Sequence, residues 1–230
     1  MRPRKPHSHA RSRIAAHGPY NVRAIYNPAH GTRPLSGPDR SCPRLSEINV
    51  TRTHHFDLTV PVSPVDHSLG PTHPAVTIVE YGDFECPNCK QAAPALKLLL
   101  ARHEGRVRLV FRNFPLEDVH PHALAAAEAA ECAGGQGKFW EMHDLLFENQ
   151  AHLKPKQLHG YAERLELDMV RFTAEMDEHI YLQRIREHIE SGRQSGVRGT
   201  PGLFVNGKIQ DASFGLKALF GATDAALKGR

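Results

Sequence analysis

The hydrophobic pattern of the chain is clearest between residues 76 and 111, where its period changes twice. Residues 76–79 form a short β-branched apolar run, which predicts a buried strand over 76–81. From residue 85 or 86 to about 102 the apolar positions recur at helical spacing, which predicts a helix. Residues 107–111 alternate apolar and charged side chains and predict a second strand. This order favours two parallel strands joined by a right-handed crossover.

A long helical stretch follows, and we expect it to form an insertion at about 118–192. Gly134 and Gly135 interrupt its helical pattern near the start. Asp168 is a plausible N-cap, because its short carboxylate can accept hydrogen bonds from the first free N–H groups of a helix. The four expected helices cover residues 122–132, 137–149, 156–165 and 168–188.

The pattern returns to strands after Gly192. Residues 203–205 are apolar, and Asn206-Gly207 is a strong signal for a two-residue hairpin, with 208–209 beginning the return strand. Residues 213–227 predict a final helix that covers the sheet. A short edge strand is expected around residues 56–62.

The first 60 residues differ from the rest in composition, being rich in Pro, Arg and His. Residues 1–55 carry a net charge of +8, so the remaining chain sums to −4. Such a segment buries too little apolar surface to order itself, and we expect a disordered basic extension over 1–60. We interpret it as a solvated extension; sequence translated upstream of the true start and a nucleic-acid-binding arm are the alternatives.

We expect the folded part to be soluble. We expect no membrane partner, and nucleic acid is an unlikely partner. The mean hydropathy is −0.45, and the sequence holds no apolar run long enough for a membrane span. The basic start is not followed by the apolar core of a secretory signal. The sequence therefore predicts a cytoplasmic location, with an extracytoplasmic one as the alternative if the start is mis-set or export is non-standard.

Two cysteines stand where the first strand meets the first helix, in the order Cys86-Pro87-Asn88-Cys89. Residues three apart share a face of a helix, so the two sulfurs can meet. At the helix N-terminus the backbone N–H groups stabilise a Cys86 thiolate, whereas Cys89 lies shielded in the first turn. This pattern predicts a dithiol redox site in which Cys86 attacks a disulfide and Cys89 resolves the product.

The alternative interpretation is that Cys86 and Cys89 supply half of the ligands of a zinc site. A plain structural disulfide between them is a third, less favoured interpretation. A structural zinc site needs four ligands, and Cys42 and Cys132 have no matching partner pattern. We therefore expect neither a metal nor an organic cofactor. Cys132 is expected to be a buried small hydrophobe and Cys42 a free thiol.

With these motifs in place, the chain resembles the DsbA-like thiol–disulfide oxidoreductases of the thioredoxin superfamily. The resemblance rests on residues 80–89, 111–115, 137–143, 199–201 and 204–207. It implies a thioredoxin-like α/β fold over 61–230, with a central mixed sheet flanked by helices and an inserted all-helical subdomain. It also implies exchange with protein or peptide thiols and disulfides, and a redox partner that recycles the cysteine pair.

The resemblance assigns further site residues. Pro201 is implied to be a cis proline beside the cysteine pair, and Thr200 to offer its backbone to a substrate peptide and its hydroxyl to the Cys86 sulfur. Pro87 and Asn88 are implied substrate contacts. Glu80 is implied to be a buried carboxyl that exchanges a proton with Cys89.

Other polar residues near the cysteines receive plainer interpretations. Asp83 and Glu85 are expected to form a solvated rim or a cap of the helix. His120 and His122 are expected to lie on the surface, and the alternative is that they approach the site from the insertion. The strongest oxidants of the family have a histidine between the cysteines. Because Asn88 carries no positive charge, we expect a less oxidising couple here.

Two other functions remain open from the sequence. One is a glutathione- or thioredoxin-linked disulfide reductase on the same fold. The other is a binding module whose dithiol regulates a partner. The direction of exchange, the substrate and the oligomeric state are not fixed by these motifs.

Overall fold

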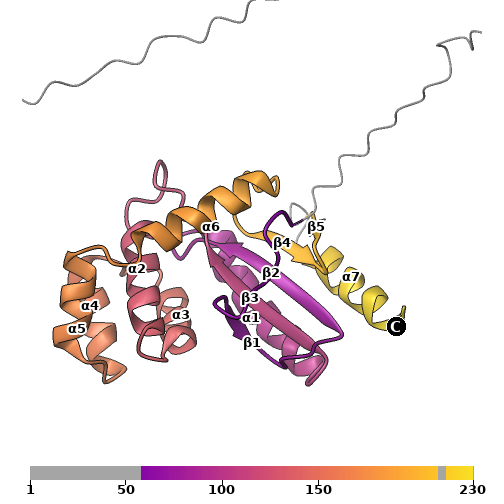
Figure 1. The fold of residues 1–230 in the computed structure, drawn as a ribbon, viewed down its shortest axis with the longest axis horizontal. Helices are drawn as coiled ribbons and strands as arrows, with labels where there is room; N and C mark the ends of the chain where they lie inside the picture. Colours follow the sequence, from indigo (N-terminus) through magenta and orange to yellow (C-terminus); the bar gives the residue numbers. More distant parts are fainter. Residues whose placement is uncertain (1–57, 212–215, 230) are drawn as a thin grey trace, which may run out of the picture. The chain divides into compact units, whose positions relative to one another are not determined.

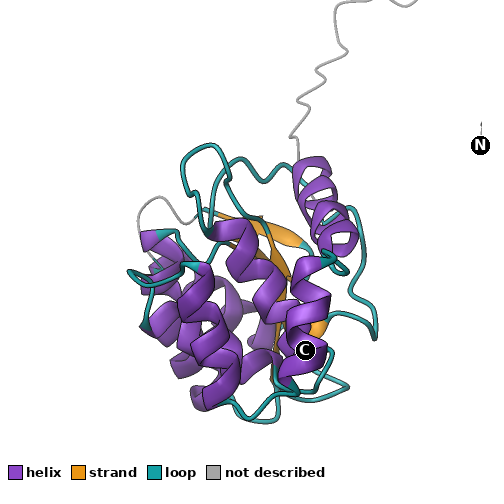
Figure 2. Cartoon of the chain, turned by 90° about the vertical axis from the view of Figure 1, so that its left-hand side faces the viewer, coloured by secondary structure: helices purple, strands orange, loops and turns teal. Residues whose placement is uncertain are grey.

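The computed structural model describes residues 58–211 and 216–229. The expected disordered extension therefore falls, apart from residues 58–60, outside the described residues, as does Cys42. The described chain forms a five-stranded mixed sheet with helices on both faces (Figures 1 and 2). This is the thioredoxin-like α/β fold that the sequence predicted.

The sheet has the strand order β1-β3-β2-β4-β5. Its two central strands run parallel, and every other neighbouring pair is antiparallel. The predicted crossover is present, because α1 (Pro87–Arg102) connects the two parallel strands. The strands are β1 (His67–Leu69), β2 (Val76–Gly82), β3 (Val107–Asn113), β4 (Gly202–Val205) and β5 (Lys208–Gln210).

The two faces of the sheet are covered by different helices, and alternation along β2 decides which side chain meets which helix. Val76 and Ile78 pack with residues of α1 and of α7 (Lys217–Lys228). Val79 and Tyr81 pack on the opposite face, where Ile189 of α6 (Leu182–Gln194) joins them. The same alternation places Glu80 on the α1 side, beneath the helix that carries the cysteine pair.

The predicted position of the edge strand was wrong. No strand forms over the described part of the expected segment, residues 58–62, and β1 pairs with β3 instead. Pro61 has no N–H to give to a ladder. The carbonyls of Val60 and Pro61 accept hydrogen bonds from the buried Arg112 guanidinium, at 2.9 and 3.0 Å.

The helical insertion contains α2 (Ala123–Gly134), α3 (Phe139–Glu148), α4 (Pro155–Arg164), α5 (Met169–Asp177) and α6. The expected N-cap is present, since the Asp168 side chain accepts from the backbone N–H groups of Val170 and Arg171. The single helix expected over 168–188 is wrong. His179 has a φ of 52° and its ring contacts Glu128 of α2 at 2.8 Å, which separates α5 from α6.

Gly192 does not end the insertion, because α6 continues to Gln194. A Cβ at this position would lie 2.7 Å from the Phe114 ring, so the glycine permits a close approach of helix and sheet. The predicted hairpin is confirmed. Asn206 and Gly207 have φ values of 47° and 79°, as its turn requires, and Val205 pairs with Lys208.

Candidate active site

The cysteine pair lies at the N-terminus of α1, directly after β2 and its turn. Cys86 is the N-cap residue, with extended backbone, and Pro87 occupies the first helical position. Cys86 is 6 % exposed and Cys89 is fully buried, whereas Pro87 and Asn88 between them are exposed. The two thiols are not bonded to each other. One sulfur is thus near the surface and the other lies beneath it.

The surroundings of Cys86 favour its thiolate. The hydrogen bond from the Cys89 side chain is the largest influence, and it lowers the pKa of Cys86. Burial opposes this effect, but the Thr200 side chain and the backbone N–H groups of Asn88 and Cys89 add to it. Together they lower the pKa of Cys86 to about 5. At neutral pH Cys86 is therefore a thiolate, the nucleophilic form of cysteine.

Cys89 shows the opposite behaviour. Burial, the hydrogen bond to Cys86 and the negative charge of Glu80 hold the pKa of Cys89 well above its usual value. The backbone N–H of Asp83 donates to the Cys89 sulfur at 3.5 Å, which only partly offsets them. Cys89 therefore remains a thiol until a base takes its proton.

The loop before β4 reaches the cysteine pair from the far end of the chain. The Thr200–Pro201 peptide bond is cis, and Cys86 Sγ lies 3.3 Å from the Thr200 carbonyl oxygen, a contact in which only the thiol form of Cys86 can donate. The Thr200 hydroxyl is buried and has no other partner in the part of the chain that the structure describes. It is therefore available to the Cys86 sulfur.

Glu80 is a fully buried carboxyl below the cysteine pair. Burial raises the pKa of Glu80, and the negative charge of Cys86 adds a smaller increase, so that the pKa is about 8. Neither of its oxygens has a hydrogen-bond partner among the described residues. A carboxyl in this state can bind or release a proton near neutral pH.

Asp83 was expected on a solvated rim of the site, but the residue is buried and only 1 % exposed. Its carboxylate accepts from the backbone N–H groups of Glu85 at 2.7 Å and Leu116 at 2.8 Å. His120 Nδ1 lies 2.7 Å from the same carboxylate. Asp83 therefore fixes the turn before Cys86. It does not cap α1, whose N-cap makes no side-chain hydrogen bond.

For His120 the structure agrees with the alternative, an approach to the site, rather than with a surface position, because its side chain is only 18 % exposed and contacts Asp83. Burial lowers the pKa of His120, while the hydrogen bond and charge of Asp83 raise it more, with smaller effects from Cys86 and Glu85. The ring thus brings a positive charge towards the site. For His122, the backbone N–H donates to the Glu85 carboxylate at 2.6 Å.

Gln150 is a site residue that the sequence did not reveal. Its side-chain amide donates to the carbonyls of Phe84 and Cys86, each at 2.9 Å. It thereby ties the cysteine turn to the segment after α3. A lone glutamine 64 positions from Cys86 carries no local signal, so only the structure brings it to this place.

Cys132 lies away from this chemistry. It is fully buried in α2, and burial raises its pKa to about 12. Among the described residues no group of three or more His, Cys, Asp or Glu side chains is placed to hold a metal ion. No helix within 58–211 or 216–229 has the length and apolar character needed to cross a membrane.

The comparisons with known proteins agree with this geometry. The thioredoxin family matches residues 63–225. The chain belongs to the thioredoxin family. Among solved structures, BdbD from Bacillus subtilis superposes with a TM-score of 0.65 at 22 % identity, covering 71 % of this chain and 94 % of that one. DsbA2 from Pseudomonas aeruginosa has a TM-score of 0.56 at 27 % identity, covering 72 % and 96 %. The DsbA-like resemblance is thereby confirmed.

Curated relatives bring a second finding. The chain is 51 % identical over 175 residues to the Na(+)/H(+) antiporter NhaA 1 of Salinispora arenicola, covering 76 % of this chain and 27 % of the antiporter. It is 36 % identical over 173 residues to the antiporter NhaA of Herminiimonas arsenicoxydans, covering 75 % and 27 %. This thioredoxin-family chain thus spans about a quarter of the length of the curated relatives it matches.

Proposed function

We propose that this chain is a thiol–disulfide oxidoreductase that acts on protein or peptide substrates through Cys86 and Cys89. The observation that carries the proposal is the placement of two free cysteines at the start of α1, with Cys86 near the surface beside the Thr200 loop and Cys89 buried beneath it. The opposite pKa shifts of the two sulfurs agree with this placement. A thiolate near the surface attacks, and a shielded thiol waits to resolve the product. Membership in the thioredoxin family supports the same chemistry.

The exchange follows from these two states. The Cys86 thiolate attacks a substrate disulfide, and one substrate sulfur leaves as a thiolate. Cys89 then loses its proton to Glu80 and attacks the Cys86 sulfur, which releases the second substrate sulfur. Two electrons pass from the dithiol to the substrate, and a disulfide forms between Cys86 and Cys89. The reverse sequence gives a disulfide to a substrate dithiol.

The substrate is proposed to lie along the loop before the cis proline. An extended peptide there would place its sulfur over Cys86, with Thr200 offering backbone hydrogen bonds. Pro87 and Asn88 are exposed beside Cys86 and would contact the same peptide. A separate redox partner would then restore the cysteine pair after each exchange.

The test is disulfide exchange with a model peptide. Cys86→Ser is expected to abolish exchange, and Cys89→Ser to accumulate a mixed disulfide between Cys86 and the peptide. Cys132→Ser is the matched control, since it removes a buried cysteine away from the site. Exchange by Cys86→Ser at the wild-type rate would overturn the proposal.

The antiporter relatives favour a second function, in which this domain acts on a Na(+)/H(+) antiporter. The domain would then adjust the redox state of cysteines in that transporter. Co-expression of Cys89→Ser with such an antiporter is expected to trap a mixed disulfide between them. Trapping of the model peptide without any trapping of the antiporter would reject this second function.

We also propose an extracytoplasmic location in place of the predicted cytoplasmic one. A thioredoxin-like protein from Salmonella enterica with the same fold is described as periplasmic. Labelling of intact cells with a membrane-impermeant thiol reagent tests this. Labelling of Cys86 before lysis supports the proposal, and labelling only after lysis contradicts it.

A further inference from the structure

A small cavity separates the buried carboxyl of Glu80 from α3. Its volume is about 30 Å³, and its walls come from β1, β2, β3, α1 and α3. Two buried polar groups line it without a hydrogen-bond partner among the described residues, namely the Glu80 carboxyl and His143 Nε2. The rest of the lining is mainly apolar, but a cavity of this size has room for one water molecule, and these two groups offer it hydrogen-bond partners.

The hydrogen-bonding state of His143 follows from its other ring nitrogen. Nδ1 lies 3.0 Å from Asp144 Oδ1, and a carboxylate can only accept, so Nδ1 carries the proton. Burial lowers the pKa of His143, which keeps the ring neutral at pH 7. Nε2 is then a bare, buried acceptor on a ring that lines the cavity.

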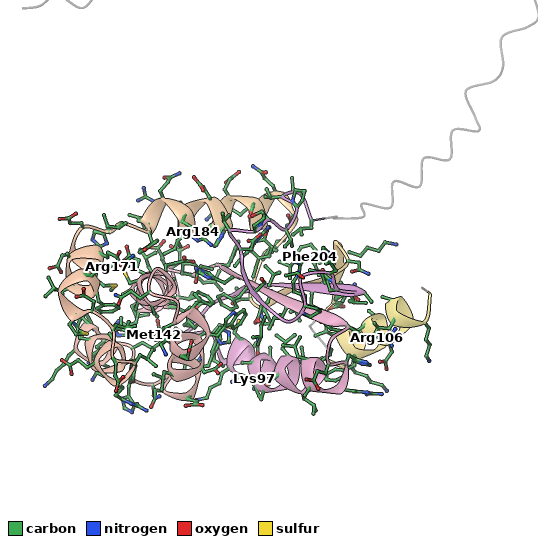
Figure 3. All side chains as sticks on the ribbon, turned by 60° about the horizontal axis from the view of Figure 1, so that its bottom comes forward. Lys97, Arg106, Met142, Arg171, Arg184 and Phe204 are labelled. Carbon is green, nitrogen blue, oxygen red and sulfur yellow. The ribbon has the colours of Figure 1, made fainter. Side chains whose placement is uncertain are left out.

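On the side of His143 away from Glu80, the Asp144 and Lys97 side chains reach solvent. Asp144 Oδ2 pairs with Lys97 Nζ at 2.6 Å, and the two side chains are 33 % and 49 % exposed. Ala93, Lys97 and Asp144 line both the small cavity and an outer groove of about 220 Å³. Figure 3 labels Lys97 on α1 and Met142, the residue before His143, on α3.

From this geometry we propose that Glu80 exchanges its proton with solvent through the cavity, His143 and Asp144. The inference rests on the proposed function, because it concerns the proton that Cys89 gives up. His143 and Asp144 touch neither sulfur and act through Glu80, so they are positioning residues. Lys97 holds the outer carboxylate in place.

Because the pKa of Glu80 is about 8, its carboxyl is mostly protonated at pH 7 and must lose its proton before it can take the proton of Cys89. Glu80 first passes its proton to a water in the cavity, and that water gives a proton to Nε2 of His143. The ring releases its Nδ1 proton to Asp144, which loses it to solvent. One proton enters the path, one leaves it, and no electron moves.

The opposite half-reaction restores the ring. After the outward transfer His143 carries its proton on Nε2. When the disulfide is reduced again, Cys89 needs a proton, and the path runs backwards from Asp144 to Glu80. The ring thus returns to its first tautomer once in each redox cycle. The charged and titratable groups that face this path are Cys86, Cys89 and Lys97 of α1, besides Asp144 itself.

The test is carbon-13 NMR of the reduced protein with labelled glutamate carboxyls, titrated from about pH 6 to 10. Glu80→Gln identifies the Glu80 resonance. In the wild type we expect a single resonance, averaged by fast proton exchange. In His143→Gln the exchange rate is expected to fall at least tenfold, giving a broadened or split resonance. Identical line shapes in the two proteins would overturn the inference, as would a shifted midpoint without slower exchange.

Asp144→Asn provides a second variant at a partly exposed position, and it is expected to slow the same exchange. His159→Gln is the matched control, because that ring packs on Phe172 away from the cavity. In single-turnover release of a peptide from Cys86, His143→Gln is expected to be about tenfold slower at pH 7. The difference should close by about pH 9.5, where Glu80 is already ionised. A rate ratio independent of pH would mean a structural role only and would reject the path.

These two measurements separate the failure of either proposal. If the wild type exchanges no disulfide with the model peptide and Cys89→Ser traps no mixed disulfide, the proposed function fails, while the NMR experiment still decides the proton path. If exchange proceeds and the Glu80 line shape does not depend on His143, only the path fails.

Discussion

Cys86 Sγ lies 3.3 Å from the Thr200 carbonyl oxygen, although 114 positions separate the two residues. The contact forms because β2 and β4 are antiparallel neighbours in the sheet. The turn that follows β2 and the loop that precedes β4 therefore meet at the same end of these strands. The sheet therefore assembles the nucleophile and its peptide-facing loop from distant parts of the chain.

The lowered pKa of Cys86 predicts an unusual pH dependence of its reactivity. Alkylation by iodoacetamide follows the thiolate fraction, so its rate should be half-maximal near pH 5 rather than near the usual ~8.5. Thr200→Val removes a hydroxyl that stabilises the thiolate and should move the half-point to higher pH. A half-point near pH 8.5 in the wild type would contradict the assignment of Cys86.

Glu80 predicts a stability change with a definite sign. Its folded-state pKa of about 8 exceeds the ordinary 4.5, so the unfolded chain ionises first as pH rises. This cost is absent below about pH 4.5, grows up to about pH 8 and is constant beyond it. Glu80→Gln should therefore raise the free energy of unfolding at pH 7 by about 3 kcal/mol. Urea denaturation at pH 4 and pH 7 measures it, and an equal effect at both values would contradict the buried carboxyl.

His120 predicts a pH dependence in the other direction. Its pKa is raised by Asp83, so its contribution to stability is present below about pH 6.5 and is lost as pH rises through the raised value. His120→Gln should destabilise the protein at pH 6 by about 1 kcal/mol or less, and not at pH 10. It should also raise the pKa of Cys86, because a nearby positive charge is lost. Thermal unfolding and alkylation rates check the two effects.

The buried pair of Asp66 and Arg112 supports the sheet rather than the chemistry. The Arg112 guanidinium donates to both Asp66 oxygens, at 2.8 and 3.0 Å, and to the Tyr81 hydroxyl at 2.9 Å. Asp66→Asn leaves a buried charge uncompensated and should cost about 3 kcal/mol in urea denaturation.

An exposed pair supplies the control for this prediction. Glu141 lies 3.6 Å from Lys138 on the surface, and Glu141→Gln should change stability by less than about 0.5 kcal/mol. The pH profile of Cys86 alkylation should be the same in both variants. A cost for Asp66→Asn as small as that for Glu141→Gln would contradict the role of the buried pair.

The sequence predicted those parts of the structure whose signals are local. The strand before Cys86, the start of α1 and the hairpin at Asn206 each depend on residues within one or two turns. The expected edge strand does not form over its described part, residues 58–62, where the carbonyls of Val60 and Pro61 bond to Arg112, a residue about fifty positions away.

Residues of the candidate site were predictable where a local motif or the family resemblance indicated them. The cysteine spacing pointed to Cys86 and Cys89, and the family resemblance to Glu80, Thr200 and Pro201. Gln150 carried no signal, because its importance comes only from the backbone carbonyls it reaches in the folded chain. Asp83 was misplaced for a similar reason, since its backbone donors and His120 converge on it only in the fold.

The most direct measurement is a redox titration of the protein in glutathione buffers, with Cys42 and Cys132 replaced by Ser. We expect a two-electron couple for Cys86 and Cys89, with a midpoint between the ~−270 mV of thioredoxin and the ~−120 mV of strong oxidants. A value near the lower limit would favour reduction of substrates, and one near the upper limit their oxidation. A dithiol that forms no disulfide between Cys86 and Cys89 at any glutathione ratio would contradict the account.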